Sequence, residues 1–587
     1  MSAAARRLVL LAVLPLAAAS ASCQREGAAA PSFASFALAE ELADFDPLEA
    51  WSTSHQVLQR QVYEGLVEYR YHGRTDEFVG LLAERWEVSE DGLEWRFRLR
   101  PDLSFYDPHE PPLWPGRRRP VVARDVVDSF LRLADPRLGA QGWFALEGLL
   151  EGLDEFRERA AKGAEEAEAA LAAARDGAGL PGLRAPDEAT VVLRLRRPAP
   201  DLLMRLASPY CVVTPREAFA HPDRGLRDHP VGSGPYSLAE WLPRSRAVFR
   251  RVPGWRTVED EHGPLPHIDE LRFQAVLEGS TRALLFEQGQ IDRLPPVQDS
   301  FARMVDGDRP SAELRARGVR LAVTETPDLS MLVLNLDDPV IGDLPGDDAG
   351  NQRRRLLRRA IALSFPYERW HRDIRERTWG SPATRYLPPS VAESAGLPES
   401  AWRRHDPELA RRLLAEAGWP GGDGLPELQL ELSGTDQGTA DLRDMVVEGL
   451  KQIGVRCRAT ANSPAEYSAK TRGGRAQLFF WSWALDWPDA ANLLEVFYSG
   501  NAGGGINRAN LRSPAFDALF EEFRGLGPGP RRMELAREMV LVLDQELPVV
   551  PVDHRRGFLL LQPWLKNVEV NPFDLFPCKY FVVESRG

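Results

Sequence analysis

Cysteine is scarce in this chain. Four cysteines occur among 587 residues, at Cys23, Cys211, Cys457 and Cys578, and no two lie at metal-ligand spacing. This excludes a disulfide-dense scaffold and a zinc centre built on closely spaced cysteines. We expect Cys211, Cys457 and Cys578 to be small, buried apolar residues.

Sequence motifs of catalysis are also absent. The ten histidines contain no His-Glu-x-x-His motif and no pair four residues apart. The nearest approach to a serine-hydrolase elbow, Gly232-Ser233-Gly234, is broken by Pro235. The glycine pattern at 177–182 follows a helical segment and contains a proline, which does not fit a dinucleotide-binding turn. The sequence therefore predicts a protein that is not an enzyme, with no metal site and no cofactor.

Basic residues are also fewer than acidic ones, 73 against 86. The formal net charge is −13, and nearly all basic residues are arginine rather than lysine. Nucleic-acid binding needs a basic surface, so we expect no nucleic-acid partner. The hydrophobic content of 43% and charged content of 27% are ordinary for a globular protein. Because 587 residues exceed what one hydrophobic core holds, the length predicts two or three lobes.

A long apolar run occurs at the N-terminus. Arg6 and Arg7 precede an apolar stretch at 8–19, and small residues at 20–22 precede Cys23. This order indicates an export signal at 1–22, too short for a comfortable membrane span. The signal resembles that of bacterial lipoproteins, although Ser20 stands where leucine is usual. The resemblance implies lipidation of Cys23; the alternative is ordinary signal cleavage, which also exports the chain.

After a small, polar stretch at 23–35 that predicts a flexible tether, strand and helix patterns alternate. Residues 81–105 predict a hairpin that turns at an Asp-Gly pair. Residues 406–422 predict a helix with Asp406 as its N-cap. A strand–helix–strand unit follows at 428–460. The fold class is therefore α/β, with exposed helices in a surface insertion at 149–175.

One stretch, FFWSWALDWPD at 479–489, combines a strand with a candidate site. Apolar residues on both faces predict a strand inside a covered, largely parallel sheet. Asp486 and Asp489 then follow among indole rings, at the strand end where ligands collect in α/β folds. A carboxylate in this position is a candidate receptor for an ammonium group. The alternative is that the tryptophans belong to the core and both aspartates cap the next turn.

Five blocks occur in order along the chain: LLAERWEVSEDGLEWRFRLRPDLSF, HPVGSGPYSLAEW, DPELARRLLAEAGWPGG, WSWALDWPDAANLL and SPAFDALFEEF. Together they resemble the oligopeptide- and dipeptide-binding family of bacterial extracellular solute-binding proteins, which are the capture components of ATP-driven importers. The resemblance runs from Phe36 to Val583. The sequence departs from the family at Ser482, where glycine is common, and at 363–366. These departures leave the substrate class open.

The resemblance implies a two-lobed α/β fold with mixed sheets flanked by helices, which closes on its ligand. The chain would cross between the lobes near Val276-Leu277 and Val552-Asp553. The implied divisions are a discontinuous first lobe at 36–70, 186–276 and 552–587, an inserted subdomain at 71–185, and a second lobe at 277–551.

The resemblance also implies a role for the loop after Trp483. In peptide-binding members, an aspartate after a Gly-Trp-x-x-Asp pattern pairs with the peptide α-ammonium, and Asp486 occupies that position here. The candidate ligand contacts are Trp483, Ala484, Leu485, Asp486, Trp487 and Asp489.

The implied partners are a peptide, the permease and ATPase subunits of an ABC importer, and the membrane through Cys23. The chain is expected to be a monomer in the periplasm or at the cell surface. The alternatives are a non-peptide solute, such as a metal chelate, haem or a sugar, or a sensor or scaffold without a transport role.

We predict that Cys23→Ala releases the exported chain from the membrane. A lipidated cysteine carries several acyl chains, which anchor stably, and alanine accepts none. Cell fractionation should find the variant in the soluble fraction, whereas a Cys457→Ala control should stay on the membrane. Full membrane retention of the Cys23 variant would contradict the anchor.

Overall fold

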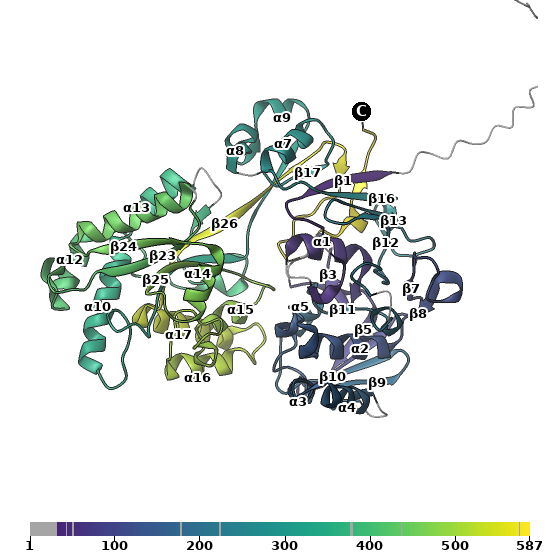
Figure 1. The fold of residues 1–587 in the computed structure, drawn as a ribbon, viewed down its shortest axis with the longest axis horizontal. Coiled ribbons are helices and arrows are strands. Elements are labelled where there is room, and N and C mark those ends of the chain that lie inside the picture. The colour runs from purple at the N-terminus through teal and green to yellow at the C-terminus, as the bar shows by residue number, and fades with distance from the viewer. Residues whose placement is uncertain are drawn as a thin grey trace, which may run out of the picture.

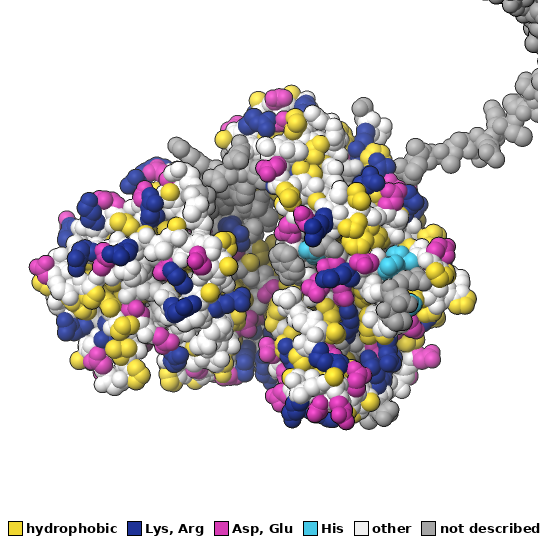
Figure 2. All heavy atoms as spheres, in the orientation of Figure 1, with side chains coloured by type: hydrophobic (Ala, Val, Ile, Leu, Met, Phe, Trp, Pro, Cys, Tyr) yellow, Lys and Arg dark blue, Asp and Glu magenta, His cyan; other side chains and the backbone are white. Residues whose placement is uncertain are grey.

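The computed structural model describes residues 32–42, 44–49, 52–74, 76–175, 179–221, 225–296, 298–375, 380–435, 437–573 and 576–586. The export signal and Cys23 lie outside the described residues. The described chain forms two α/β bodies bridged at one end by a small helical unit (Figure 1). Figure 2 shows that this face of the molecule is hollowed between the two bodies.

The first body contains a four-stranded sheet built from segments that are far apart in the sequence. Its strand order is β1 (Phe33–Leu38), β16 (Glu270–Ala275), β13 (Arg246–Arg251) and β12 (Tyr236–Leu242). Strand β1 runs parallel to β16, and the other pairs are antiparallel. Helix α1 (Thr53–Val62) packs beside β12 and faces the second body.

The second sheet of the first body is antiparallel, in the order β5 (Ala83–Val88), β6 (Glu94–Leu99), β10 (Thr190–Arg194) and β9 (Leu183–Asp187). The predicted hairpin is confirmed as β5 and β6, and Gly92 adopts φ of 69° in its turn. Helix α2 (Ala123–Ala134) covers the sheet. The segment at 149–175 forms the predicted helices, α3 (Leu153–Ala160) and α4 (Ala164–Arg175).

The second body is organised on an eight-stranded sheet. Its main path is β17 (Arg293–Leu294), β26 (Val549–Leu561), β21 (Asp328–Leu334), β25 (Leu478–Ala484), β23 (Leu428–Ser433) and β24 (Cys457–Asn462), and β20 (Arg320–Glu325) and β22 (Gly380–Pro382) also pair with β26. Strand β25 does lie inside the sheet, but the expectation of largely parallel neighbours is wrong. It runs antiparallel to β21 and parallel to β23, because the chain reaches β21 and β26 by connections other than a βαβ crossover.

The two faces of β25 contribute to different cores, as the alternation of its side chains predicts. Leu478 and Phe480 pack among the residues of α10 (Asp348–Ser364), α12 (Pro407–Glu416) and α13 (Gln437–Gln452). Phe479 packs with α15 (Ala490–Leu494), α16 (Pro514–Phe523) and α17 (Pro530–Glu546). The N-cap prediction for Asp406 is confirmed, since its carboxylate accepts from the Leu409 N–H at 2.9 Å.

Strand β26 connects the second body to the small helical unit. Its first residues pair with β21, and residues 556–561 pair with β20. The unit contains α7 (Gly279–Glu287), α8 (Gln298–Met304) and α9 (Ala312–Ala316), and its separate core includes Phe286, Leu314 and Phe558. The chain enters this unit directly after β16 and leaves the second body along β26, so the chain crosses between the bodies at this end of the molecule (Figure 1).

We predict that ligand binding brings the two bodies together by bending near Val276 and Val552. Few chain crossings join the bodies, so rotation there disturbs little of either core. Small-angle scattering with a saturating peptide should give a smaller radius of gyration than the ligand-free protein gives. An unchanged radius would favour a rigid scaffold.

Candidate functional site

The loop that follows β25 is held against the start of β21. The Leu485 N–H donates to the Pro327 carbonyl at 2.7 Å, and the Asp486 N–H donates to Asn492 Oδ1 at 2.8 Å. Asn492 belongs to α15, which begins directly after the loop. Both ends of the loop are therefore fixed, and Asp486 is offered at the sheet end, facing the first body.

Residues of the first body reach the Asp486 carboxylate. The Tyr210 hydroxyl and the Asn492 side chain lie close to it, and both favour its ionised form by lowering its pKa. Gln56 on α1 donates from Nε2 to the Tyr210 oxygen at 3.1 Å, which orients the phenol. Asp486 is thus the point at which a loop of the second body meets α1 and the segment after α5 (Leu202–Ala207).

The Asp486 carboxylate lacks a direct cationic partner. Its side chain is half-buried, and it forms no ion pair with any residue in the described part of the chain. Burial raises the pKa of Asp486 to about 6, against the opposing effects of its hydrogen bonds and of the Arg205 charge. Arg205 is itself committed, because its Nε lies 2.7 Å from Asp201. The site therefore presents a desolvated carboxylate that a cation would stabilise.

Trp487 seals the contact between the two bodies. It is buried, its ring stacks on Phe144 with centroids 6.0 Å apart, and the Arg205 guanidinium lies 4.4 Å from the ring centroid. Both partners come from the first body. The ring therefore excludes water from the neighbourhood of Asp486.

The other candidate contacts divide between exposed and buried positions. Trp483 is half-buried and donates from Nε1 to the Asn492 carbonyl at 2.9 Å, while Ala484 is exposed at the end of β25. Leu485 is buried. Ala484 and the Trp483 ring are thus available at the surface beside Asp486, whereas Leu485 holds the loop.

Asp489 is engaged within the second body. Its Oδ1 accepts from the Ala491 N–H at 2.7 Å and lies 2.6 Å from Arg532 Nη2, and the residue is buried. Arg532 also pairs with Glu393 at 2.6 Å. The capping interpretation is confirmed for Asp489 but not for Asp486, which caps no helix.

Sequence reasoning did not identify the first-body side of this site. Gln56, Tyr210 and Arg205 come from segments far from Asp486 in the chain, and none lies in a motif. Glu495 was also missed; burial raises its pKa to about 7, and it accepts from Asn492 Nδ2 at 3.0 Å. Only their convergence in space marks these residues.

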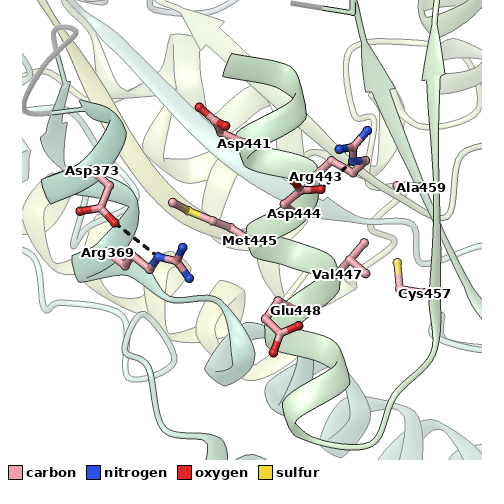
Figure 3. A pocket seen from close by; sticks show the side chains of 10 residues that line it. All are labelled: Arg369, Asp373, Asp441, Arg443, Asp444, Met445, Val447, Glu448, Cys457 and Ala459. Atoms are coloured by element: carbon pink, nitrogen blue, oxygen red, sulfur yellow. Dashed lines mark hydrogen bonds and ion pairs between the residues drawn. The ribbon is translucent and has the colours of Figure 1, made fainter. Parts of the chain in front are cut away.

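A cavity of about 660 Å³ lies over α13, and none of its lining residues belongs to the Asp486 loop (Figure 3). Its charges are satisfied locally, since Arg369 pairs with Asp373 at 3.3 Å and Arg443 with Asp444 at 2.8 Å. Burial raises the pKa of the Cys457 thiol to about 11, so the thiolate is disfavoured. This cavity carries no evident chemistry.

Another cavity, of about 270 Å³, is lined by Pro327, whose carbonyl accepts from the Leu485 N–H. It is bounded by α1 and the C-terminal tail on one side, and by β26 and the β20–β21 link on the other. Among the described residues, no group of three or more His, Cys, Asp or Glu side chains is placed to hold a metal ion. No described helix is both long and apolar enough to cross a membrane.

Known proteins share both the sequence pattern and the fold of this chain. The chain is 25% identical over 535 residues to heme-binding protein A of Haemophilus influenzae. The alignment covers 89% of this chain and 86% of that protein. It is 24% identical over 534 residues to the dipeptide-binding protein of Escherichia coli, covering 89% and 88%. The solved structure of HbpA2 from Haemophilus parasuis matches with a TM-score of 0.73 at 20% identity, over 94% of this chain and 100% of that one.

The family described as bacterial extracellular solute-binding proteins, family 5, matches residues 77–505, which is well over half of the chain. Members of this family are binding proteins that serve ABC importers and not enzymes. The chain belongs to family 5 of the bacterial extracellular solute-binding proteins.

Proposed function

We propose that this protein captures peptides between its two bodies and delivers them to an ABC permease, with Asp486 receiving the peptide α-ammonium. The observation that carries the proposal is the half-buried Asp486 carboxylate, which has hydrogen-bond donors but no ion-pair partner among the described residues. An ionised carboxylate taken out of water without a cation is unfavourable. A ligand ammonium would remove that penalty.

The neighbours of Asp486 suit this role. Trp487, Phe144 and Arg205 exclude water, which strengthens an ion pair formed beside them. Tyr210, held by Gln56, favours the ionised carboxylate before the ligand arrives. Because every peptide carries the same terminus and backbone, a cleft that binds these groups accepts many sequences.

The relatives leave the solute class open, because one is named for haem and another for dipeptides. The charge at the site favours a cationic group over an anionic one. Haem presents carboxylates at its edge, and a carboxylate brought beside ionised Asp486 would be repelled. A peptide presents its ammonium there.

The proposal extends to location and motion. A lipid anchor at Cys23 and the tether at 23–35 would hold the protein near its permease, at the membrane surface. The lobe divisions inferred from the sequence would let the bodies close about the segments after β16 and within β26.

We predict that Asp486→Asn weakens peptide binding by about thirty-fold to several thousand-fold. Loss of one partner of a desolvated charge pair costs about 2–5 kcal/mol, which corresponds to that range of affinity. Calorimetry with free and N-acetylated peptides makes the test specific: acetylation should weaken binding to wild type and cost much less in the variant, because one interaction cannot be lost twice. If acetylation costs wild type nothing, the ammonium is not recognised and the peptide proposal fails.

Asp489→Asn is the matched control. The asparagine oxygen can still cap α15, but the charge partner of buried Arg532 is lost. We expect a lower melting temperature and an unchanged penalty for peptide acetylation. Asp486→Asn, by contrast, should melt no lower than wild type at pH 7.5 without ligand, because burial disfavours the charge that it removes.

We predict that peptide affinity falls as the pH drops below about 6. Burial raises the pKa of Asp486 to about 6, so below this pH the ligand-free carboxyl is protonated and must release its proton to pair with the ammonium. The decline should approach about tenfold per pH unit and level off once the pKa of the bound form is passed. The fall in peptide affinity with pH should be smaller in Asp486→Asn. Any pH dependence that remains in this variant would report the titration of Glu495, whose charge faces Arg205 and Asp201. An equal decline in both proteins would contradict the assignment.

A further inference from the structure

The two bodies touch each other directly, away from the chain segments that connect them. Helix α5 of the first body faces α15 of the second body, below the helical unit in Figure 1. Residues of both bodies line a cavity of about 30 Å³ at this contact, which has room for little more than a water molecule. The bodies are therefore closely packed here, although no chain segment crosses between them at this place.

Arg205 of α5 is held in one orientation by its own body. Its Nε lies 2.7 Å from Asp201, and its Nη1 donates to the carbonyls of Phe144 and Ala145 at 3.4 Å and 3.3 Å. Ordering a long side chain at the moment of contact opposes association. Arg205 is ordered within the first body by these contacts, so it can meet the second body without that cost.

The surface that Arg205 meets is the indole ring of Trp487. The guanidinium carbon lies 4.4 Å from the ring centroid, and the Phe144 ring stacks on the same indole with centroids 6.0 Å apart. Trp487 is buried, although both of these partners belong to the other body. A cation over a desolvated indole is favourable, and so is removing the indole from water. Neither effect requires a solute.

Three carboxylates of the second body also face Arg205 across the boundary. They belong to Asp486, Asp489 and Glu495. Burial raises the pKa of Glu495 to about 7, and the Arg205 charge is the largest effect that opposes burial there. The charge of Arg205 is thus attracted to the second body, and separation of the bodies would remove this attraction.

The other arginine of the first body at this boundary does not contribute in the same way. Arg197 donates from Nη1 to the Arg524 carbonyl at 3.3 Å. Burial lowers the pKa of Arg197, and the Arg524 charge lowers it further. Because these two positive charges repel each other, the contact of Arg205 with Trp487 is the one that favours the closed arrangement.

We propose that Arg205 and Trp487 form a latch that holds the two bodies together in the absence of solute. The ligand-free protein then populates closed and open arrangements, and a bound solute shifts the population further toward the closed one. The latch raises the affinity for any solute that binds the closed form, because it raises the fraction of protein in that form. The inference does not rest on the solute being a peptide.

The test is small-angle scattering of ligand-free Arg205→Met, which keeps an apolar side chain at this position. Its radius of gyration should exceed that of ligand-free wild type. Loss of a desolvated cation–indole contact should lower the ratio of closed to open protein by up to about thirtyfold. The affinity for a mixed pool of synthetic tripeptides, measured by calorimetry, should fall by up to the same factor. A saturating amount of the pool should bring both proteins to the same radius.

Trp487→Leu tests the latch from the second body and leaves the Asp201–Arg205 pair intact. Its ligand-free radius should also exceed that of wild type. Adding Arg205→Met to this variant should increase the radius little further, because one contact cannot be lost twice. If circular dichroism shows that Arg205→Met is unfolded, because Asp201 has lost its partner, the Trp487 variant decides the matter.

Arg157→Met is the matched control. The Arg157 guanidinium carbon lies 4.9 Å from the Trp143 ring centroid, and its Nη1 donates to the Ala134 carbonyl at 3.1 Å. All three residues belong to the first body, so the variant loses the same kind of contact without affecting the boundary. Its ligand-free radius and its affinity for the peptide pool should equal those of wild type.

The ligand-free radii separate this inference from the proposed function. If folded Arg205→Met and Trp487→Leu have the radius of wild type, the latch is refuted, whatever their affinities for the pool. An equal increase in Arg157→Met would show general loosening and would also refute it. If the radii increase as expected but the peptide pool does not bind to wild type, the latch stands and the peptide proposal fails.

Discussion

The pairing of β26 is the constraint on which the rest of the structure depends. This 13-residue strand hydrogen-bonds to β21 and β22 in the second body and to β17 and β20 in the helical unit. One continuous backbone ladder therefore fixes the second sheet, the small core around Phe286 and the path by which the chain returns to the first body. Separate segments could not hold these units in register without further contacts.

Some buried charges of this protein are paired within the fold, and others are not. The Glu68–Lys579 pair, with nitrogen and oxygen 2.7 Å apart, and the Arg532 cluster are closed within the chain. Breaking such a pair leaves a buried charge and destabilises the fold strongly. Asp486 is different, because no described residue gives it an opposite charge in contact. It lies where the two bodies meet, so a solute held between them can supply the missing cation.

The contact between the bodies would also couple binding to closure. Trp487 belongs to the second body, but it is buried by Phe144 and Arg205 from the first. Separation of the bodies would expose this ring and leave Asp486 without Tyr210. The geometry of the proposed ammonium site therefore exists only when the bodies are together, and a ligand bound there would favour that arrangement.

The sequence by itself determined the local structure and the general function. The alternation in β25, the Asp91-Gly92 turn and the Asp406 cap specify their elements because each depends only on nearby residues. The block order pointed to the family, and the indole-flanked Asp486 marked one side of the site. Only the tertiary structure distinguished Asp486 from Asp489, since that difference depends on Arg532, which lies 43 residues along the chain from Asp489. It alone brought Tyr210 and Gln56 to the neighbourhood of Asp486, because whether a charge is paired is decided by residues distant in sequence that meet only in the fold.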